Sequence, residues 1–283
     1  MLLWAGFSLH FRVENQHAFV KPEGNMPHEW NAKEYERLGD PMTRWGGQVL
    51  ERLQLNGDET VLDGGCGTGR VTEQLLAKLP RGKVIGADAS AKMIEEARER
   101  FAGNSRVTLV VADLATIELP EQVDAILSTA TFHWIKDHDK LFTQLATILK
   151  PDGQLVAQCG GATNIAGVMA AIEEVMRSPT YATAFDDWYG PWLYATPEET
   201  HARLARAGFT DIHTWLNPEP TTLNSRQHLI DYLVTIILGQ HVLRLPQEQH
   251  LPFAEAVADA LLRRAGQPLI DYVRLNIVAR RAR

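Results

Sequence analysis

A short apolar run meets a glycine-rich turn at Thr60-Val61-Leu62-Asp63-Gly64-Gly65-Cys66-Gly67-Thr68-Gly69. The run predicts a buried strand that ends in an acid, and apolar residues at helical spacing over 70–79 predict a helix directly after the turn. Glycines between a strand and a helix permit a tight turn and let a ligand approach the backbone closely. We therefore expect a ligand-binding loop over residues 64–69.

The spacing of the glycines separates two kinds of nucleotide loop. A dinucleotide fingerprint of the form Gly-x-Gly-x-x-Gly that began at Gly65 would need a glycine where the chain has Arg70. The observed pattern is acid-x-Gly-x-Gly-x-Gly, from Asp63 to Gly69. This pattern argues against an NAD-dependent oxidoreductase, which stays as the less favoured alternative.

Strand and helix patterns alternate up to about residue 160. Further strands are predicted at 83–88, 107–113, 123–128 and 154–158, with helices over 90–101 and 140–149 and a turn at 150–153. This alternation indicates a parallel sheet with helices on both faces. Ligands bind such sheets beyond the carboxyl ends of the strands, where Asp63, Asp88 and Asp113 lie in the sequence. Ser90 is the expected N-cap of the helix over 90–101.

The pattern becomes less regular after residue 161. Helices are predicted at 165–176, 197–207, 225–238 and 247–264, strands at 211–216 and 270–278, and an aromatic loop at 186–192. Residues 1–25 are interpreted as a loosely packed extension with only a faint likeness to a signal peptide, and Met26 is an alternative start.

Composition narrows the function classes. The chain has 283 residues, of which 45% are hydrophobic and 22% charged, as expected for a globular protein. Its net charge of −7 disfavours nucleic-acid binding, and no apolar run is long enough to cross a membrane. The two cysteines, Cys66 and Cys159, are expected to be buried rather than nucleophilic and are compatible with a cytoplasmic location. No metal site is expected, because His241, Glu248 and His250 lack a metal-ligand spacing.

Three elements carry a family resemblance. The loop Asp63-x-Gly65-x-Gly67-x-Gly69, then Asp88, then Ala112-Asp113-Leu114 resemble, in order, the cofactor-binding elements of class I S-adenosylmethionine (SAM)-dependent methyltransferases. The resemblance implies that Asp63 helps to hold the methionine ammonium group, that Asp88 accepts the ribose hydroxyls and that Asp113 receives the adenine amino group. The cofactor-binding set it implies is Asp63, Gly65, Cys66, Gly67, Gly69, Asp88, Ala89, Met93, Ala112, Asp113, Leu114, Thr129, Trp134, Trp30 and Arg44.

Shorter segments along the chain refine the resemblance. They are similar to the group related to trans-aconitate methyltransferase, and they comprise His28-Glu29-Trp30-Asn31, Tyr35, Arg44, residues 131–135, 160–164 and 207–209, and Asp271-Tyr272-Val273-Arg274-Leu275. Gly64 and Gln158 depart from the group's pattern, in which an aliphatic residue and an acid are more common. Gln158 therefore puts a carboxylate role at that position in doubt.

The resemblance also implies the architecture. We expect a doubly wound, Rossmann-like α/β fold with seven mostly parallel strands and the last strand inserted antiparallel. The cofactor-binding core is expected to comprise residues 26–164, 196–220 and 267–283. Residues 165–195 and 221–266 are expected to form a helical cap that encloses a small-molecule substrate.

Aromatic and histidine side chains are the candidates for the chemistry. Aromatic faces attract a sulfonium cation, so Trp30, Tyr35 and Trp134 are candidates for this contact, whereas Trp188 and Trp192 are expected to pack hydrophobically. The predicted catalytic residues are His133 and Tyr35. His133 is either a general base for a hydroxyl or amine acceptor, a hydrogen-bonding group for an anionic one, or a loop residue that orders the site.

A carboxylate acceptor would need no base, because it is already deprotonated at neutral pH. Arg44 is a candidate to bind such a carboxylate, and Arg244 is expected to be a solvated surface residue. The sequence thus favours a SAM-dependent methyltransferase that acts on a small molecule, with O-methylation of a carboxylic acid as one form of the reaction. A non-catalytic SAM-binding regulatory module is the alternative, and the sequence does not distinguish a monomer from a homodimer.

Overall fold

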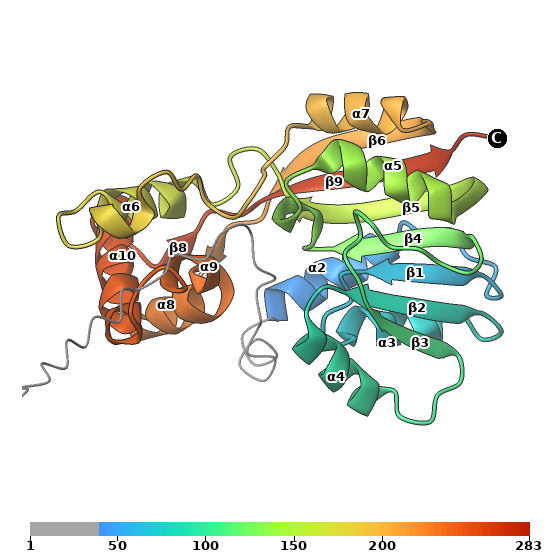
Figure 1. Cartoon of the computed structure of the whole chain (residues 1–283), viewed down its shortest axis with the longest axis horizontal. Coiled ribbons are helices and arrows are strands. Elements are labelled where there is room, and N and C mark those ends of the chain that lie inside the picture. Colours follow the sequence, from blue (N-terminus) through green and yellow to red (C-terminus); the bar gives the residue numbers. More distant parts are fainter. Residues whose placement is uncertain (1–39) are drawn as a thin grey trace, which may run out of the picture.

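The computed structural model describes residues 40–283, with side chains from Trp45 onward. Seven strands form one sheet in the order β3-β2-β1-β4-β5-β9-β6 (Figure 1). Their bounds are β1 Thr60–Gly64, β2 Lys83–Asp88, β3 Val107–Val111, β4 Val123–Thr129, β5 Leu149–Gly160, β6 Phe209–Pro218 and β9 Val273–Arg281. The first five strands of this order pair in parallel, and β9 lies antiparallel between β5 and β6. The expected fold class and the antiparallel insertion of the last strand are confirmed.

Helices cover both faces of the sheet, because successive strand residues point to opposite sides. In β1, Val61 packs in one cluster with Val49 and Leu75, whereas Leu62 packs in another with Leu145 and Leu204. The first cluster joins the sheet to helices α2 and α3, and the second joins it to α5 and α7. The helices of this half are α2 Asp40–Leu50, α3 Arg70–Ala77, α4 Ala91–Arg100, α5 His138–Ile148 and α7 Pro197–Arg206, with the short 3-10 helix η1 Phe132–Trp134.

Two helices of this half begin with side-chain caps. The Oγ of Ser90 accepts a hydrogen bond from the Met93 N–H at the start of α4, as the sequence predicts. At α7, Thr196 and Glu199 form a reciprocal capping box.

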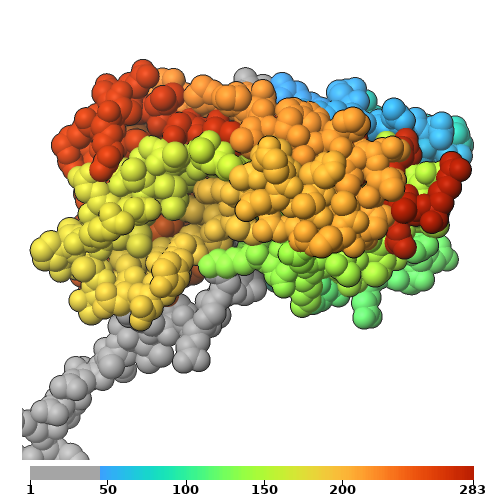
Figure 2. Space-filling view, turned by 90° about the horizontal axis from the view of Figure 1, so that it is seen from above, coloured from blue at the N-terminus to red at the C-terminus, as the bar shows by residue number. Residues whose placement is uncertain are grey.

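A helical lobe lies beside the strand ends (Figure 1). It contains α6 Ala166–Met176, η2 Ala182–Phe185, α8 Arg226–Tyr232, the π-helix η3 Leu233–Ile237, α9 Gly239–Val242, η4 Gln247–Gln249, α10 His250–Ala265, and the paired short strands β7 Thr221–Thr222 and β8 Leu269–Ile270. The lobe buries its own apolar cluster, which includes Val168, Leu229, Phe253 and Val257. On the face that carries α7, the lobe and the sheet half form one continuous surface (Figure 2).

The structure corrects three predicted elements. The helix predicted over 225–238 changes at Leu233 into a π-helix, in which the Leu238 N–H donates to the Leu233 carbonyl oxygen at 2.7 Å. The turn predicted at 150–153 is an irregularity inside β5, where Asp152 has a φ of 64° and the pairing with β4 shifts register. The strand predicted at 270–278 is divided, because Ile270 pairs with Thr221 in the lobe before β9 enters the sheet.

Within residues 40–283, no helix combines the length and the apolarity that a membrane-spanning segment needs. The same part of the chain has no group of three or more His, Cys, Asp or Glu side chains placed to hold a metal ion.

Candidate active site

The glycine loop makes a tight turn with positive φ values at its glycines, as its sequence predicts. Gly65, Gly67 and Gly69 have φ values of 77°, 55° and 87°, which L-residues rarely adopt. The Gly65 N–H donates to the Ala87 carbonyl oxygen at 2.7 Å, which ties the loop to β2. A Cβ atom added at Gly67 would meet nothing within 4 Å, so the loop backbone is open toward the space beside it.

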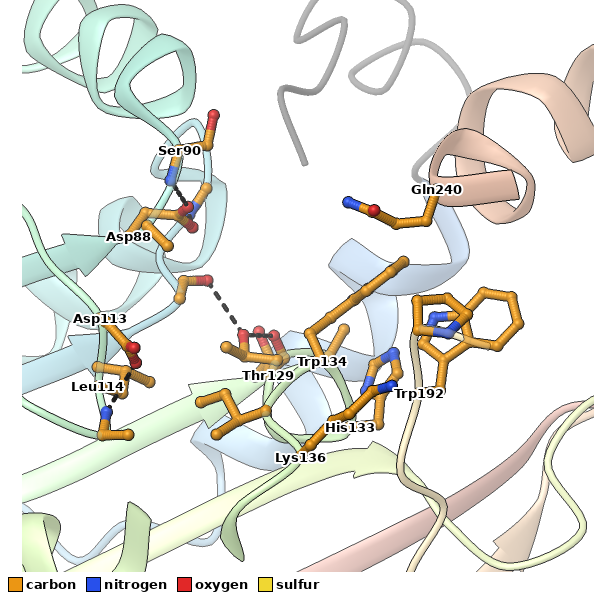
Figure 3. A pocket seen from close by; sticks show the side chains of 18 of the residues that line it. Asp88, Ser90, Asp113, Leu114, Thr129, His133, Trp134, Lys136, Trp192 and Gln240 are labelled. Carbon is orange, nitrogen blue, oxygen red and sulfur yellow. Dashed lines mark hydrogen bonds between the residues drawn. The ribbon is translucent and has the colours of Figure 1, made fainter. Parts of the chain in front are cut away.

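That space is a cavity of about 570 Å³ at the carboxyl ends of the parallel strands, a size typical of small-molecule sites. Acids and apolar groups from the loops after β2 and β3 lie on one side of it, and aromatic groups lie on the other (Figure 3). Among the residues predicted from the sequence, those that line it are Gly65, Gly67, Asp88, Ala89, Met93, Ala112, Asp113, Leu114, Thr129, His133 and Trp134.

Two aspartates at strand ends present acceptor groups to this cavity. One carboxylate oxygen of Asp88 accepts from the Gly67 N–H at 3.0 Å and the other from the Ser90 N–H at 2.9 Å. Asp113 is held by the Ala115 N–H at 2.9 Å. Backbone donors thus orient both carboxylates, and each oxygen keeps further lone pairs for hydroxyl or amino donors.

Asp63, which the resemblance implies helps to hold the methionine ammonium group, is not among the residues that line the cavity. It is 1% exposed and lies behind the loop, where its Oδ2 accepts from the Thr72 hydroxyl at 2.6 Å and its Oδ1 has no partner. Burial raises the pKa of its carboxyl group to about 6. Asp63 can therefore influence a ligand by holding the glycine loop in place and through the negative charge of its ionised carboxylate.

Other predicted residues lie off the cavity wall or outside the described chain. Cys66 and Gly69 belong to the loop but not to the wall, because the Cys66 side chain packs next to Gly86 and Gly69 begins α3. Burial raises the pKa of the Cys66 thiol, consistent with an unreactive group. Trp30 and Tyr35 lie outside the described residues, and so does the side chain of Arg44.

His133 follows β4 and is buried on the aromatic side of the cavity. Its Nδ1 accepts the Gly160 N–H at 3.3 Å, which leaves the proton of the neutral ring on Nε2. Burial, and then the positive charges of Arg274 and His138, hold the pKa of His133 well below its usual range. His133 is therefore a neutral hydrogen-bond donor at physiological pH and lacks a free basic nitrogen for proton abstraction.

Arg274 is the main cavity residue to which the sequence analysis assigned no role, although it lies in a segment that carries the family resemblance. Because β9 runs antiparallel, its start lies at the carboxyl edge of the other strands, where Arg274 pairs with Gly160. The residue is 3% exposed, its guanidinium lies over the rings of Trp45 and Tyr272 at 4.9 and 5.8 Å, and its Nε has no partner. An arginine inside an apolar strand pattern is the signal that would have found it.

No carboxylate among residues 45–283 forms an ion pair with Arg274. Burial lowers the pKa of the guanidinium, but an arginine in a protein stays charged at neutral pH. The cavity thus contains a desolvated positive charge whose counter-ion is not supplied by the described protein.

The lobe and the loop before α7 complete the aromatic side. Further lining residues that the sequence analysis missed are Asn164, Ile165, Tyr194, Ile236, Ile237, Gln240 and Tyr272. Trp192, expected only to pack, also lines the cavity, and it stacks on Tyr194 with ring centroids 5.8 Å apart. Trp188 packs against His241 away from the wall, and Arg244 lies over its ring at 5.4 Å.

The fold and the cavity together define a class I SAM-dependent methyltransferase. The open backbone at Gly67 and the carboxylates of Asp88 and Asp113 lie along one cavity at the carboxyl ends of the parallel strands, which is where such folds bind nucleotide-like cofactors. Comparison with known proteins agrees. Residues 61–153 match the model of a methyltransferase domain family.

Relatives align along almost the whole chain. An uncharacterised methyltransferase of Schizosaccharomyces pombe is 30% identical over 90% of this chain and 99% of its own length. A trans-aconitate 2-methyltransferase of Paracidovorax citrulli is 27% identical over 90% of this chain and 99% of its own length. The chain therefore belongs to the class I SAM-dependent methyltransferases, in the group that resembles trans-aconitate methyltransferase.

A solved structure supports the fold. The phosphoethanolamine N-methyltransferase 2 of Haemonchus contortus, in complex with SAM, has a TM-score of 0.58 and 21% identity, covering 89% of this chain and 56% of that one.

Proposed function

We propose that this methyltransferase transfers the methyl group to a carboxylate oxygen of a small-molecule acid. The observation that carries the proposal is Arg274, a buried cation in the wall of the cavity that has no ion-pair partner among residues 45–283. Leaving a charge buried without a partner is costly, so a bound anion is the natural counter-ion. The relatives named trans-aconitate 2-methyltransferase act, by that name, on a carboxylic acid, which supports the same class of acceptor.

Arginine suits this role chemically. Its planar guanidinium donates two parallel hydrogen bonds to a carboxylate, which fixes orientation as well as position. The rings of Trp45 and Tyr272 contact the guanidinium, and no partner among the described residues bonds to its Nε. We propose that Arg274 positions the acceptor in this way.

The state of His133 agrees with a carboxylate acceptor. A carboxylate is deprotonated at neutral pH and needs no general base, and the neutral His133 has an N–H to donate. When bound, SAM supplies a methyl group on a sulfonium centre that is already electrophilic. We propose that Gly65, Gly67, Asp88 and Asp113 hold SAM, that Trp134 faces it, and that the buried wall excludes water.

Two measurements test this proposal. Calorimetric titration with S-adenosylhomocysteine (SAH) is expected to show binding that Asp88→Asn weakens, because each oxygen of that carboxylate orders the loop or the ligand. Turnover with methyl-labelled SAM and a panel of acids is expected to yield a product that mild base hydrolyses. Methyl esters are labile in base, whereas N-methyl and C-methyl products are not.

Arginine variants locate the acceptor site. Arg274→Leu is expected to retain SAH binding and to lose about 10- to 100-fold in kcat/KM, the range for a hydrogen bond to a charged group. Arg280→Leu is the matched control, because Arg280 lies on the same strand and donates to the Asp152 carbonyl oxygen away from the cavity. A base-stable product, or full activity in Arg274→Leu, would overturn the proposal.

A further inference from the structure

Apolar side chains of the lobe cover the cavity beyond the sheet. Ile236 and Ile237 come from η3, Ile165 precedes α6, and Pro191 and Trp192 come from the loop before α7. The three isoleucines are at most 7% exposed. A ligand on this side of the cavity therefore contacts hydrocarbon and an indole ring.

The π-helix contributes to this wall. The wider turn closed by the Leu238 N–H and the Leu233 carbonyl oxygen is followed at once by α9, and both Ile236 and Ile237 reach the cavity. Short π segments are often found at functional sites. Val234 of the same segment is instead 40% exposed at the surface.

Positive charge is scarce in this wall. Of the cationic side chains among residues 45–283 that line the cavity, Arg274 is buried, whereas Lys136 and Lys140 are exposed at its rim. Lys136 is also engaged, because its Nζ donates to the Gly190 carbonyl oxygen at 2.7 Å. One carboxylate next to Arg274 and His133 would be matched by donors.

The neutral polar groups of the wall bond to one another. Asn164 accepts the Val273 N–H at 2.9 Å and bonds to the Tyr194 side chain, and the hydroxyl groups of Tyr272 and Tyr232 are 2.8 Å apart. Gln240 is a further polar group on the lobe side, and it carries no charge. A second or third carboxylate placed against the isoleucines would lose its hydration without gaining a cation from residues 45–283, which is strongly unfavourable.

We propose that the preferred acceptor is a monocarboxylic acid with an apolar body, bound by Arg274 at its carboxylate and by Ile236, Ile237 and Trp192 along its body. This inference rests on the proposed function and specifies the acceptor class of the same site. The acid is expected to be of modest size, because the cavity of about 570 Å³ must hold the acceptor together with the cofactor.

A series of acids tests the inference. Straight-chain monocarboxylates from butanoate to octanoate are expected to rise in kcat/KM by about fourfold for each added methylene until the cavity is filled, the factor for burying one such group. Octanedioate and trans-aconitate, with additional carboxylates, are expected to be at least tenfold poorer acceptors than octanoate. A kcat/KM that does not depend on chain length, or a preference for trans-aconitate, would overturn the inference.

Variants of η3 test whether the lobe causes the dependence of kcat/KM on the chain length of the acid. Ile236→Ala is expected to flatten the dependence on chain length while SAH affinity and thermal stability are monitored in parallel. Val234→Ala is the matched control, because it removes an aliphatic group from the same segment at the surface, and it should leave the series unchanged. If Ile236→Ala folds, binds SAH and keeps the full dependence on chain length, the inference is wrong.

The two proposals fail in different ways. Base-labile methylation of trans-aconitate in preference to octanoate would refute the apolar acceptor but keep carboxylate methylation. SAH binding without a base-labile product from any acid would refute both.

Discussion

The pKa of the Asp63 carboxyl group is strongly raised, and its effect on the stability of the protein can be measured. Its carboxyl group is wholly buried behind the glycine loop, with one oxygen bonded to the Thr72 hydroxyl and the other without a partner. Burial raises its pKa from 3.8 to about 6, which corresponds to about 3 kcal/mol of unfavourable free energy once the group is ionised. We predict that Asp63→Asn makes the stability of the protein less dependent on pH.

The direction in which stability changes with pH follows from how tightly each state binds the Asp63 proton. The folded state holds the Asp63 proton more tightly than the unfolded chain, so its contribution to stability is greatest below pH 3.8 and is lost as pH rises through about 6. Asparagine does not titrate. The free energy of unfolding of Asp63→Asn, relative to that of wild type, should therefore increase by roughly 1–2 kcal/mol between pH 5 and pH 8. This is the part of the ionisation free energy of Asp63 that falls between these two pH values.

The asparagine amide adds a constant offset. The amide NH2 group would replace the buried Oδ1 of Asp63, which has no hydrogen-bond partner among the described residues, and would lower the stability by about 1–3 kcal/mol. This cost does not change with pH. The informative quantity is thus the change between the two pH values. Urea unfolding of wild type and Asp63→Asn at pH 5 and pH 8 measures it, with Asp58→Asn, which removes an exposed carboxylate, as the matched control. An identical difference between the variants at both pH values would refute the reasoning.

Three further predictions concern the loop, the thiols and the histidine. Gly67→Ala should weaken SAH binding at least tenfold, because its Cβ would stand in open space beside the loop, and its positive φ should cost roughly 1–2 kcal/mol of stability. Gly65→Ala should lower the melting temperature further, because its Cβ also collides with the Thr131 side chain. Cys159, whose pKa burial raises to about 12, should react with a thiol reagent at pH 8 only after unfolding, as mass spectrometry would show. For His133, whose pKa is held far below neutrality, kcat/KM should be flat from pH 6 to 8, and His133→Gln, which retains a donor, should keep more activity than His133→Phe. A kcat/KM that rises with a pKa near 6.5 would show that His133 acts as a base.

Local hydrophobic pattern predicted much of the parallel part of the sheet. Buried strands such as β1 appear as continuous apolar runs, and the glycines at 65, 67 and 69 coincide with positive φ values. The acids that line the cavity lie at the ends of their strands, Asp88 as the last residue of β2 and Asp113 two residues after β3, so the position of each strand also positions its acid. The antiparallel insertion of β9 was implied by family resemblance, because local pattern does not specify which strands become neighbours.

Predictions were less accurate where distant segments control the backbone. Apolar residues continue through 225–238 at helical spacing, but the sequence pattern does not show the change to a π-helix at Leu233. Similarly, the strand predicted over 270–278 is divided because the chain leaves the lobe and enters the sheet at that point.

Contacts between near neighbours in the chain specify the strand–helix order, the glycine loop and the acids at the strand ends, so local sequence pattern predicts these features. The side of the cavity that is proposed to bind the acceptor depends instead on long-range packing. The pairing of Gly160 with Arg274 and the hydrogen bond from Gly160 to His133 bring a cation and a neutral imidazole together from distant parts of the chain. Long-range packing buries Arg274 in the wall of the cavity and removes its water, which is why an anionic ligand is proposed there.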